Sequence, residues 1–338
     1  MISIIIPTYN EAKNLKKLVP SIRQVIPNAE IIVVDDNSPD NTAKVARELG
    51  CKVVVRPKKM GLASAVIEGI KVANNDIIAV MDADLQHPPE LLPKMYELAR
   101  DGYDIVIASR YINGSSVKMN WFRKLISKVA TKITHILLKE SRIVKDPMSG
   151  YFVIKRKVIN GVKLNPRGFK ILLEILVRGQ YSKVVEVPYT FNQREYGKSK
   201  FGIREIIEYI KLILELSEYR PIKFMIVGSS GIIVNLSVLH LMLSLGFPVF
   251  VAGATAIESA ITWNFNLNDL WTFRSRRTGR KIVRWLKYHL AVGTGALINY
   301  LTLLILAFLG FPPLIADIIG IFLGYIANFL ISQEVVWR

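Results

Sequence analysis

The sequence contains a single cysteine, Cys51, among its 338 residues. One cysteine excludes an intrachain disulfide and a thiolate metal cluster. Charged residues are scarce from Pro221 onward, where only nine Lys/Arg and four Asp/Glu occur. The chain before Pro221 holds the other 36 basic and 23 acidic side chains and so carries most of the formal net charge of +18. A domain this basic is typical of proteins that bind nucleic acid or an anionic lipid surface.

Four long apolar stretches occupy the C-terminal third and favour the lipid bilayer as the partner. No nucleic-acid motif is recognised, so we expect no nucleic-acid partner. Each stretch is long enough to span a bilayer as a helix, and they cover about residues 222–245, 249–270, 285–309 and 314–335. The stretches form an internal repeat with one constant offset, in which Gly231 matches Gly295 and Asn235 matches Asn299. The repeat predicts two duplicated helical hairpins.

The distribution of basic residues predicts the membrane topology. Both hairpin tips, around Gly246 and Gly310, lack Lys and Arg, whereas the connection 274–287 is densely basic. By the positive-inside rule, the N-terminal domain, this connection and both termini face the cytoplasm. Four polar residues lie within or near the predicted spans and are compatible with transport or with hydrogen bonding between helices: Glu258, Asn264, Asp317 and Asn328.

The chain from residue 1 to residue 81 alternates short apolar strands with amphipathic helices. The expected strands are 2–6, 30–35, 52–56 and 76–81, and the expected helices are about 11–25, 41–49 and 62–73. This alternation predicts a parallel, doubly wound sheet, with a further strand expected over 103–109. Ligands bind such sheets at the carboxyl edge of the strands.

An apolar run over residues 77–81 ends in Asp82-Ala83-Asp84, and Gln86 follows. Along an extended chain, Asp82 and Asp84 point to the same side. Two carboxylates and an amide oxygen at a strand end are suited to a hard divalent cation that holds a diphosphate. The alternative is a pair of solvated aspartates in a turn. Polar clusters also follow the first two expected strands, at Pro7–Glu11 and at Asp35–Ser38, although Asn10 could simply cap a helix.

These clusters carry a resemblance to a known family. The segments PTYNE from Pro7, VVDDNSPDNT from Val33 and DADLQHPP from Asp82 resemble the motifs of family-2 glycosyltransferases of the A-type fold. The resemblance covers about residues 1–220 and is to the branch that transfers sugars to polyprenyl phosphates. Residues 221–338 resemble the GtrA-like membrane family. Together they imply an α/β, Rossmann-like glycosyltransferase domain followed by a four-helix transmembrane domain.

The resemblance also implies roles for individual residues. The nucleoside would be held by Pro7, Tyr9, Glu11, Val34 and Asp36. Asp82, Asp84 and Gln86 would hold Mg²⁺ or Mn²⁺ on the donor diphosphate, while Asp82 and Ala83 also touch the donor. The implied reaction transfers mannose from GDP-mannose to dolichyl (polyprenyl) phosphate. UDP-glucose as the donor and a lipid-linked sugar flippase are the alternatives.

Two amphipathic helices are expected in the membrane interface, within about residues 115–139 and 201–219. Over 121–138, apolar residues recur every three or four positions, and the other face carries Arg123, Lys124, Lys128 and Lys132. A surface helix packed on its own domain is the alternative. Over 203–216 the apolar face is broad. The two helices could frame the mouth of a site for a lipid substrate.

The remaining candidates bind the acceptor and the leaving group. Arg123 and Ser127 are four residues apart and share a helical face, where the resemblance places the acceptor phosphate, and Arg110 is expected to join them. Arg194 and Lys200 resemble the family's basic G-x-S-K segment, which closes over the diphosphate, although an exposed charged loop is the alternative. Asp84, Arg110, Arg123 and Ser127 are the catalytic candidates. Asp146, in a D-x-x-S-G segment, either orients the acceptor region or caps a turn.

The sequence lacks the Q-x-x-R-W segment of family members that glycosylate a hydroxyl: Glu195 and Tyr196 follow Gln193-Arg194. A phosphate acceptor is already anionic and needs no general base to become a nucleophile. It needs cations that hold it in line with the anomeric carbon. Attack opposite the leaving group predicts inversion, with a β-linked product from an α-linked donor.

Overall fold

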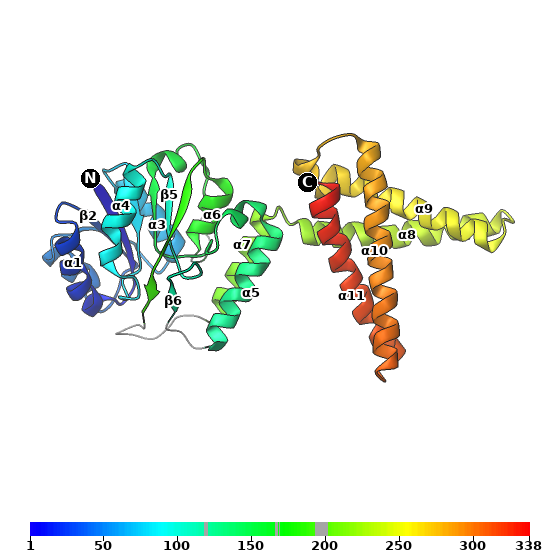
Figure 1. Cartoon of the computed structure of the whole chain (residues 1–338), viewed down its shortest axis with the longest axis horizontal. Coiled ribbons are helices and arrows are strands. Elements are labelled where there is room, and N and C mark those ends of the chain that lie inside the picture. The colour runs from blue at the N-terminus through cyan, green and yellow to red at the C-terminus, as the bar shows by residue number, and fades with distance from the viewer. Residues whose placement is uncertain (118–120, 166–167, 169, 193–201) are drawn as a thin grey trace. The chain divides into compact units, whose positions relative to one another are not determined.

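The computed structural model describes the chain except for residues 118–120, 166–167, 169 and 193–201 and the side chains of residues 122 and 123 (Figure 1). The described residues form two compact units, Met1–Leu216 and Ser217–Arg338. The first is a layered α/β domain and the second is entirely helical.

A seven-stranded sheet forms the centre of the first unit, in the order β3-β2-β1-β4-β7-β5-β8 (Figure 1). The strands are β1 (Ile2–Thr8), β2 (Glu30–Asp35), β3 (Lys52–Val55), β4 (Ile77–Val80), β5 (Ile105–Ser109), β7 (Phe152–Lys155) and β8 (Val184–Pro188). The four strands β3, β2, β1 and β4 are parallel, so the predicted parallel alternation is confirmed for this part of the sheet. A small second sheet pairs β6 (Ser116–Val117) with β9 (Thr190–Phe191).

Strand β7 departs from the parallel pattern and runs antiparallel to β4 and β5. The reason lies in the segment before it. Asp146 is hydrogen-bonded to Arg110 just beyond the end of β5, so the chain enters β7 from the carboxyl edge of β5 and must run in the opposite direction. The result is a mixed sheet whose carboxyl edge is nevertheless shared by β1, β2 and β4.

Helices cover both faces of the sheet because its strands are apolar on both sides. On one face, α1 (Ala12–Val25), α2 (Thr42–Glu48) and α4 (Leu92–Arg100) pack with Ile2, Ile4 and Ile6. On the other, α3 (Leu62–Val72) and α6 (Ile171–Arg178) pack with Ile5. The alternation along β1 therefore assigns its isoleucines to two separate cores.

The expectation that Asn10 caps the first helix is wrong. The residue that precedes α1 is Glu11, and Asn10 has a left-handed backbone with a φ of 61°. The amide of Ala12 instead donates to Asp40 Oδ2 at 3.1 Å. A side chain from the loop after β2 thus binds the start of α1, and this long-range contact is not visible in local sequence.

Two further helices, α5 (Trp121–Leu137) and α7 (Ile203–Leu216), lie beside one another in this unit (Figure 1). The Tyr209 hydroxyl of α7 donates to the Ala130 carbonyl of α5 at 2.6 Å. Leu212, Ile213 and Leu216 pack with Leu138 and Leu173. Each helix thus has one face fixed against its own domain.

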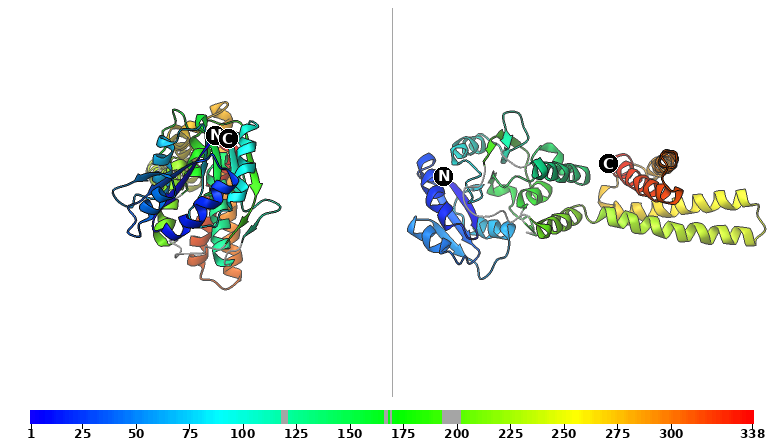
Figure 2. Two further views of the ribbon diagram at one scale, coloured as in Figure 1. Left: turned by 90° about the vertical axis from the view of Figure 1, so that its left-hand side faces the viewer. Right: turned by 90° about the horizontal axis from the view of Figure 1, so that it is seen from below.

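The second unit consists of two helical hairpins. The first joins α8 (Arg220–Ser244) to α9 (Val249–Leu267), and these helices lie side by side (Figure 2). The second joins α10 (Lys281–Phe308) to α11 (Pro313–Ile331). In the described part of the chain, three helices are long and apolar enough to cross a membrane: Arg220–Ser244, Lys281–Phe308 and Pro313–Val336. Helix α9 carries Glu258 and Asn264, and its role as a fourth span stays a prediction.

The internal repeat is visible in three dimensions. Helices α9 and α11 each continue into a π-helical turn, over Asn268–Thr272 and Ser332–Val336. The next residues, Phe273 and Trp337, stack with ring centroids 4.5 Å apart. Other ring contacts also occur as pairs that the repeat relates: Phe224–Phe329 at 5.6 Å corresponds to Tyr288–Phe265 at 5.8 Å. The two hairpins are therefore joined by an aromatic cluster with approximate two-fold symmetry.

The repeated glycines allow close helix approach. A Cβ added at Gly231 would overlap the Asn264 side chain, and one at Gly295 would overlap the Asn328 side chain. Each asparagine therefore packs directly against the facing glycine within its own hairpin. The Oδ1 atoms of both asparagines are buried without a hydrogen-bond partner among the described residues, so the two proposed roles of Asn264 and Asn328 stay predictions.

Candidate active site

A pocket of about 440 Å³ lies at the carboxyl edge of the sheet. Its described lining comes from the segments after β1, β2, β3 and β4, together with Gly168 and the start of α7. Seven residues predicted to bind the donor are among the lining residues: Pro7, Tyr9, Glu11, Asp36, Asp82, Ala83 and Asp84. The volume is in the range of small-molecule sites.

Of the described residues predicted to hold the nucleoside, Val34 alone is not among the lining residues, and the predicted metal ligand Gln86 is not among them either. The Val34 side chain is fully buried in the core of the sheet. Its carbonyl accepts a hydrogen bond from Thr8 Oγ1 at 3.3 Å. Any contact of Val34 with a nucleoside would therefore involve its backbone.

Asp36 organises one wall of the pocket. Its Oδ2 accepts hydrogen bonds from the amides of Met60 and Gly61, at 3.1 and 3.3 Å, and its carboxylate pairs with Arg56. The loop held in this way places Lys59 Nζ 4.8 Å from the centre of the Tyr9 ring. A cation and an aromatic face thus stand together where the nucleoside is expected.

The predicted metal-binding residues follow β4 in a tight turn. Leu85 has a left-handed φ of 62°, and the amide of Gln86 donates to Asp84 Oδ1 at 3.2 Å. The Gln86 Nε2 donates to the Asn192 carbonyl at 2.9 Å, so the nitrogen and not the oxygen of the amide makes this bond. Both Asp82 and Asp84 line the pocket.

The residues present fit a hard divalent cation. Carboxylate and amide oxygens are the donors that Mg²⁺ and Mn²⁺ prefer. No group of three or more His, Cys, Asp or Glu residues suited to a metal occurs within the described residues. The predicted set has two carboxylates and one amide, and it would be completed by diphosphate oxygens, as in other sites that bind a cation through its substrate.

His87 was not singled out from the sequence, yet it supports this turn. Its ring is buried and stacks on Tyr151, with centroids 5.0 Å apart. Its Nδ1 accepts a hydrogen bond from the Asp82 amide at 3.1 Å. Burial lowers the pKa of His87 to about 4, so the ring is neutral at physiological pH and can act as an acceptor.

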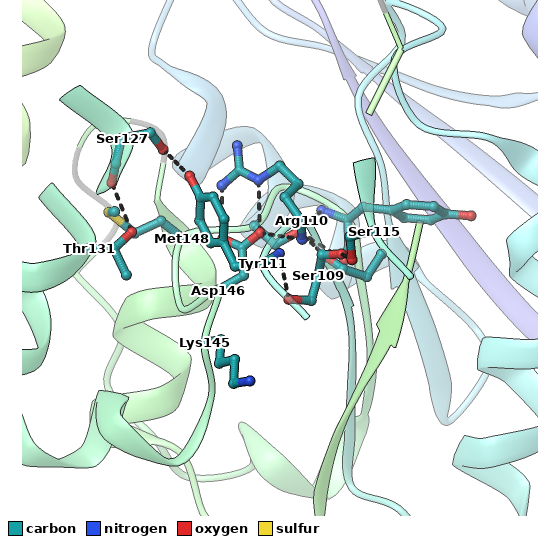
Figure 3. A network of polar contacts seen from close by, with 12 residues as sticks. Ser109, Arg110, Tyr111, Ser115, Ser127, Thr131, Lys145, Asp146 and Met148 are labelled. Carbon is teal, nitrogen blue, oxygen red and sulfur yellow. Dashed lines mark hydrogen bonds and ion pairs between the residues drawn. The ribbon is translucent and has the colours of Figure 1, made fainter. Parts of the chain in front are cut away.

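Arg110 and Asp146 form a buried two-point ion pair (Figure 3). The Nε–Oδ2 and Nη2–Oδ1 distances are both 2.8 Å, and the Arg110 amide donates to the same carboxylate at 3.0 Å. Arg110 is not among the described residues that line the pocket. Of the two roles considered for Asp146, the geometry favours orientation of this region, because the carboxylate fixes both the side chain and the backbone of Arg110.

Ser127 on α5 is connected to the same region through Tyr111, whose hydroxyl donates to Ser127 Oγ at 2.6 Å (Figure 3). Helix α5 is therefore tied to the loop that follows β5. The side chain of Arg123, and the whole of Arg194 and Lys200, lie outside the described residues. Their roles stay predictions.

Lys170 is a second residue that the sequence analysis missed. Its Nζ donates to the Met148 carbonyl at 2.8 Å, and its charge interacts with Arg110, Asp146 and Asp82. Burial, with repulsion from Arg110, lowers the pKa of Lys170 to about 8. The amine therefore carries most of its positive charge at pH 7 and loses it just above.

The two amphipathic helices expose apolar side chains on the faces that do not pack on the domain. On α5 these are Trp121, Leu125, Val129 and Ile133, spaced by four residues, and on α7 they are Ile203, Ile206, Ile207 and Ile210. Packing of both helices on their own domain leaves these rows uncovered, and their place in a membrane interface stays a prediction. Such faces are typical of helices that lie in a membrane interface.

Comparison with known proteins agrees with this arrangement. Residues 3–162 match the family Glycosyl transferase family 2, and residues 223–337 match the GtrA/DPMS, transmembrane domain, family. The protein is thus a glycosyltransferase with a helical membrane domain. It is 48% identical to the dolichol-phosphate mannosyltransferase of Pyrococcus furiosus, over 99% of each chain. The chain belongs to the dolichol-phosphate mannosyltransferase family.

More distant similarities cover the first unit. The dolichol-phosphate mannosyltransferase of Saccharomyces cerevisiae is 34% identical over 64% of this chain and 87% of its own length. A crystal structure of glucosyl-3-phosphoglycerate synthase from Mycobacterium tuberculosis, in complex with Mn²⁺, UDP-glucose and phosphoglyceric acid, has a TM-score of 0.51 and 19% identity. It covers 64% of this chain and 80% of that chain. At this identity the match supports the A-type fold alone.

Proposed function

We propose that the protein transfers mannose from GDP-mannose to dolichyl (polyprenyl) phosphate with inversion, giving the β-mannosyl phosphate of the lipid. The observation that carries the proposal is the pocket in which Asp82 and Asp84 stand beside the Tyr9–Asp36 wall. The full-length similarity to an enzyme named for dolichol-phosphate mannosyl transfer supports the choice of sugar and acceptor.

In this proposal, the pocket residues bind the donor and fix its diphosphate. Asp82, Asp84 and Gln86 would hold Mg²⁺ or Mn²⁺, which would supply positive charge to the leaving nucleoside diphosphate. His87 keeps the Asp82 backbone in place through its uncharged ring. Arg194 and Lys200 are proposed to close over the same diphosphate.

The acceptor phosphate is proposed to approach from α5, where Arg123 and Ser127 share a helical face. It attacks the anomeric carbon directly, because a phosphate oxygen already carries the negative charge that a hydroxyl would gain only from a base. Lys170 adds a positive charge that interacts with Asp82. The side chain of Arg110 is held in place near the acceptor by its ion pair with Asp146. The exposed rows on α5 and α7 are proposed to enter the head-group layer, where the lipid phosphate resides.

The membrane unit is proposed to span the bilayer four times, with α9 as the additional span. The basic connection 274–287 and both chain termini would lie in the cytoplasm. The active site would then face the compartment that supplies nucleotide sugars.

A transfer assay on the purified full chain tests the donor and the metal. Dolichyl phosphate is incubated with Mn²⁺ and either radiolabelled GDP-mannose or radiolabelled UDP-glucose, each with and without EDTA. We expect label in the organic phase only from GDP-mannose, and its loss with EDTA. Label only from UDP-glucose would overturn the donor, and transfer that persists in EDTA would overturn the metal.

A further inference from the structure

The contact between α9 and α10 carries a network of four polar side chains. Both oxygens of Glu258 lie 3.1 Å from His289 Nε2. The Thr262 hydroxyl donates to Glu258 Oε1 at 3.0 Å and accepts from Trp285 Nε1 at 3.2 Å. We call this set of residues, Glu258, Thr262, Trp285 and His289, the polar ladder.

The duplicated hairpins do not share the polar ladder. The internal repeat matches its four positions with Phe322, Ile326, Pro221 and Met225, which are all apolar. The aromatic cluster and the Gly–Asn contacts, in contrast, occur in both copies. The repeat-related positions of the other hairpins are thus packed without polar groups, so the repeated fold does not require the polar ladder.

The polar ladder is open to its surroundings. The side chain of Glu258 is 51% exposed and that of His289 is 24% exposed. Ionisable groups in membrane segments are costly and occur where they meet a polar partner. A carboxylate that only joined two helices would be covered by them. The Glu258 carboxylate is therefore accessible from outside the helix pair.

The depth of the polar ladder points to lipid head groups. His289 lies eight residues after Lys281, the first residue of α10, which is ~12 Å along a helix. Exposed tryptophans, Trp263 and Trp271, follow Thr262 on α9 and in the turn after it. Tryptophan and basic residues mark the interface of a membrane, so the α10 side of the polar ladder, Trp285 and His289, lies toward the head-group layer, while Glu258 lies at the middle of α9.

The chemistry of the polar ladder selects the head group. The Glu258 carboxylate repels phosphate and accepts charge-assisted hydrogen bonds from hydroxyl groups. The Trp285 and His289 rings, with centroids 4.1 Å apart, offer flat apolar faces, while their N–H groups are used within the polar ladder. Together they suit neighbouring hydroxyls on an apolar ring, as in a sugar. We propose that the polar ladder binds the sugar of a glycosyl phosphate lipid, the class of product that the proposed function releases into the same bilayer.

A photoreactive probe tests this proposal on the full chain in phospholipid vesicles. The probe is a synthetic β-mannosyl phosphate of a short prenol with a diazirine in the prenyl chain, and the same prenyl phosphate without sugar is the reference. Mass spectrometry locates the labelled peptides. We expect the sugar-bearing probe to label α9 and α10 at least fivefold more than the reference, and excess unlabelled mannosyl lipid to suppress that difference.

Substitutions distinguish labelling that depends on the polar ladder from labelling caused by nonspecific contact with the membrane. Glu258→Gln and Thr262→Val should each reduce the labelling by the sugar-bearing probe to the reference level. Asp317→Asn, which removes a carboxylate on α11, should leave it unchanged. Equal labelling by the two probes, labelling that survives Glu258→Gln, or cross-links from α9 to a second protein chain would overturn the proposal. Because the probe is synthetic, failure of mannose transfer would overturn only the proposed function.

Discussion

A hydrogen bond between the Asp82 amide and His87 places an uncharged ring behind the proposed metal site. The ring can accept this bond only while Nδ1 is unprotonated. Burial enforces that state, because a charged imidazole would have to give up its hydration. His87 thus fixes the backbone position of Asp82, a residue proposed to bind the metal and the donor.

The buried state of His87 predicts a pH dependence of stability. Burial lowers its pKa from the ordinary 6.5 to about 4. Between these values the unfolded chain binds a proton that the folded chain does not, so the free energy of unfolding falls as the pH falls through this window. A shift of this size corresponds to about 3 kcal/mol. We expect the melting temperature of the first unit to fall less between pH 6.5 and 4.5 in His87→Gln than in the wild type.

The half-buried histidine of α5 gives the matched control. His135→Gln makes the same histidine-to-glutamine change away from the proposed metal site, and the slope of melting temperature against pH in His87→Gln is compared with it. An unchanged slope in His87→Gln would show that protonation of His87 does not limit acid stability.

The lowered pKa of Lys170 predicts that mannose transfer slows as the pH rises. Burial and repulsion from Arg110 lower its pKa to about 8, so its positive charge disappears as the pH rises through 8. We expect kcat for mannose transfer to fall between pH 7 and 9. Lys170→Met should lower kcat at least tenfold at pH 7, because the charge beside Asp82 is lost, and Lys170→Arg should shift the inflection above pH 9. An inflection near 8 that persists in Lys170→Arg would assign it to another group.

At the scale of elements, the sequence analysis predicted five of the seven strands of the large sheet but missed β7 and β8, and it did not predict strand direction. The apolar runs located β1, β2 and β4, and the expected strand 30–35 coincides with β2. Periodicity contains no information on direction, and the antiparallel β7 depends on the Arg110–Asp146 contact, which joins residues 36 positions apart. Lys170 was not predicted as a site residue for the same reason, because its interaction with Asp82 arises only from the fold. His87 lies within the recognised DADLQHPP segment, but its role was not predicted because its burial cannot be read from the sequence.

The glycine–asparagine contacts predict a sharp packing effect in the second hairpin. A Cβ at Gly295 would overlap the Asn328 side chain, so Gly295→Ala should destabilise the membrane unit by about 1–3 kcal/mol. Gly293→Ala is the matched control, because nothing lies within 4 Å of a Cβ there. Thermal melting in detergent measures both.

A double substitution tests the contact itself. Asn328→Ala removes the clashing side chain, so it should restore part of the melting temperature lost in Gly295→Ala. Equal losses in Gly293→Ala and Gly295→Ala, or additive losses in the double variant, would contradict direct packing.

For the whole molecule, the sequence predicted the division into domains and the helical hairpins better than the positions of individual site residues. The change from charged alternation to apolar stretches predicted two parts, and the internal repeat predicted the paired hairpins that the structure contains. The apolar content of α9 is reduced by Glu258 and its asparagines, so hydropathy alone does not identify it as a span. Of the predicted donor residues, those at strand ends line the pocket because parallel strands share an edge. Val34, inside a strand, is not among the lining residues.

The most direct measurement of the central claim compares mannose transfer by the wild type and by Asp84→Ala. Both are assayed as full chains in vesicles with GDP-mannose, Mn²⁺ and dolichyl phosphate, and matched melting temperatures establish that the variant is folded. If the Asp82–Asp84 turn holds the metal on the donor, transfer to lipid should fall at least a thousandfold in Asp84→Ala. Transfer at a rate within tenfold of the wild type would contradict the assignment of the active site.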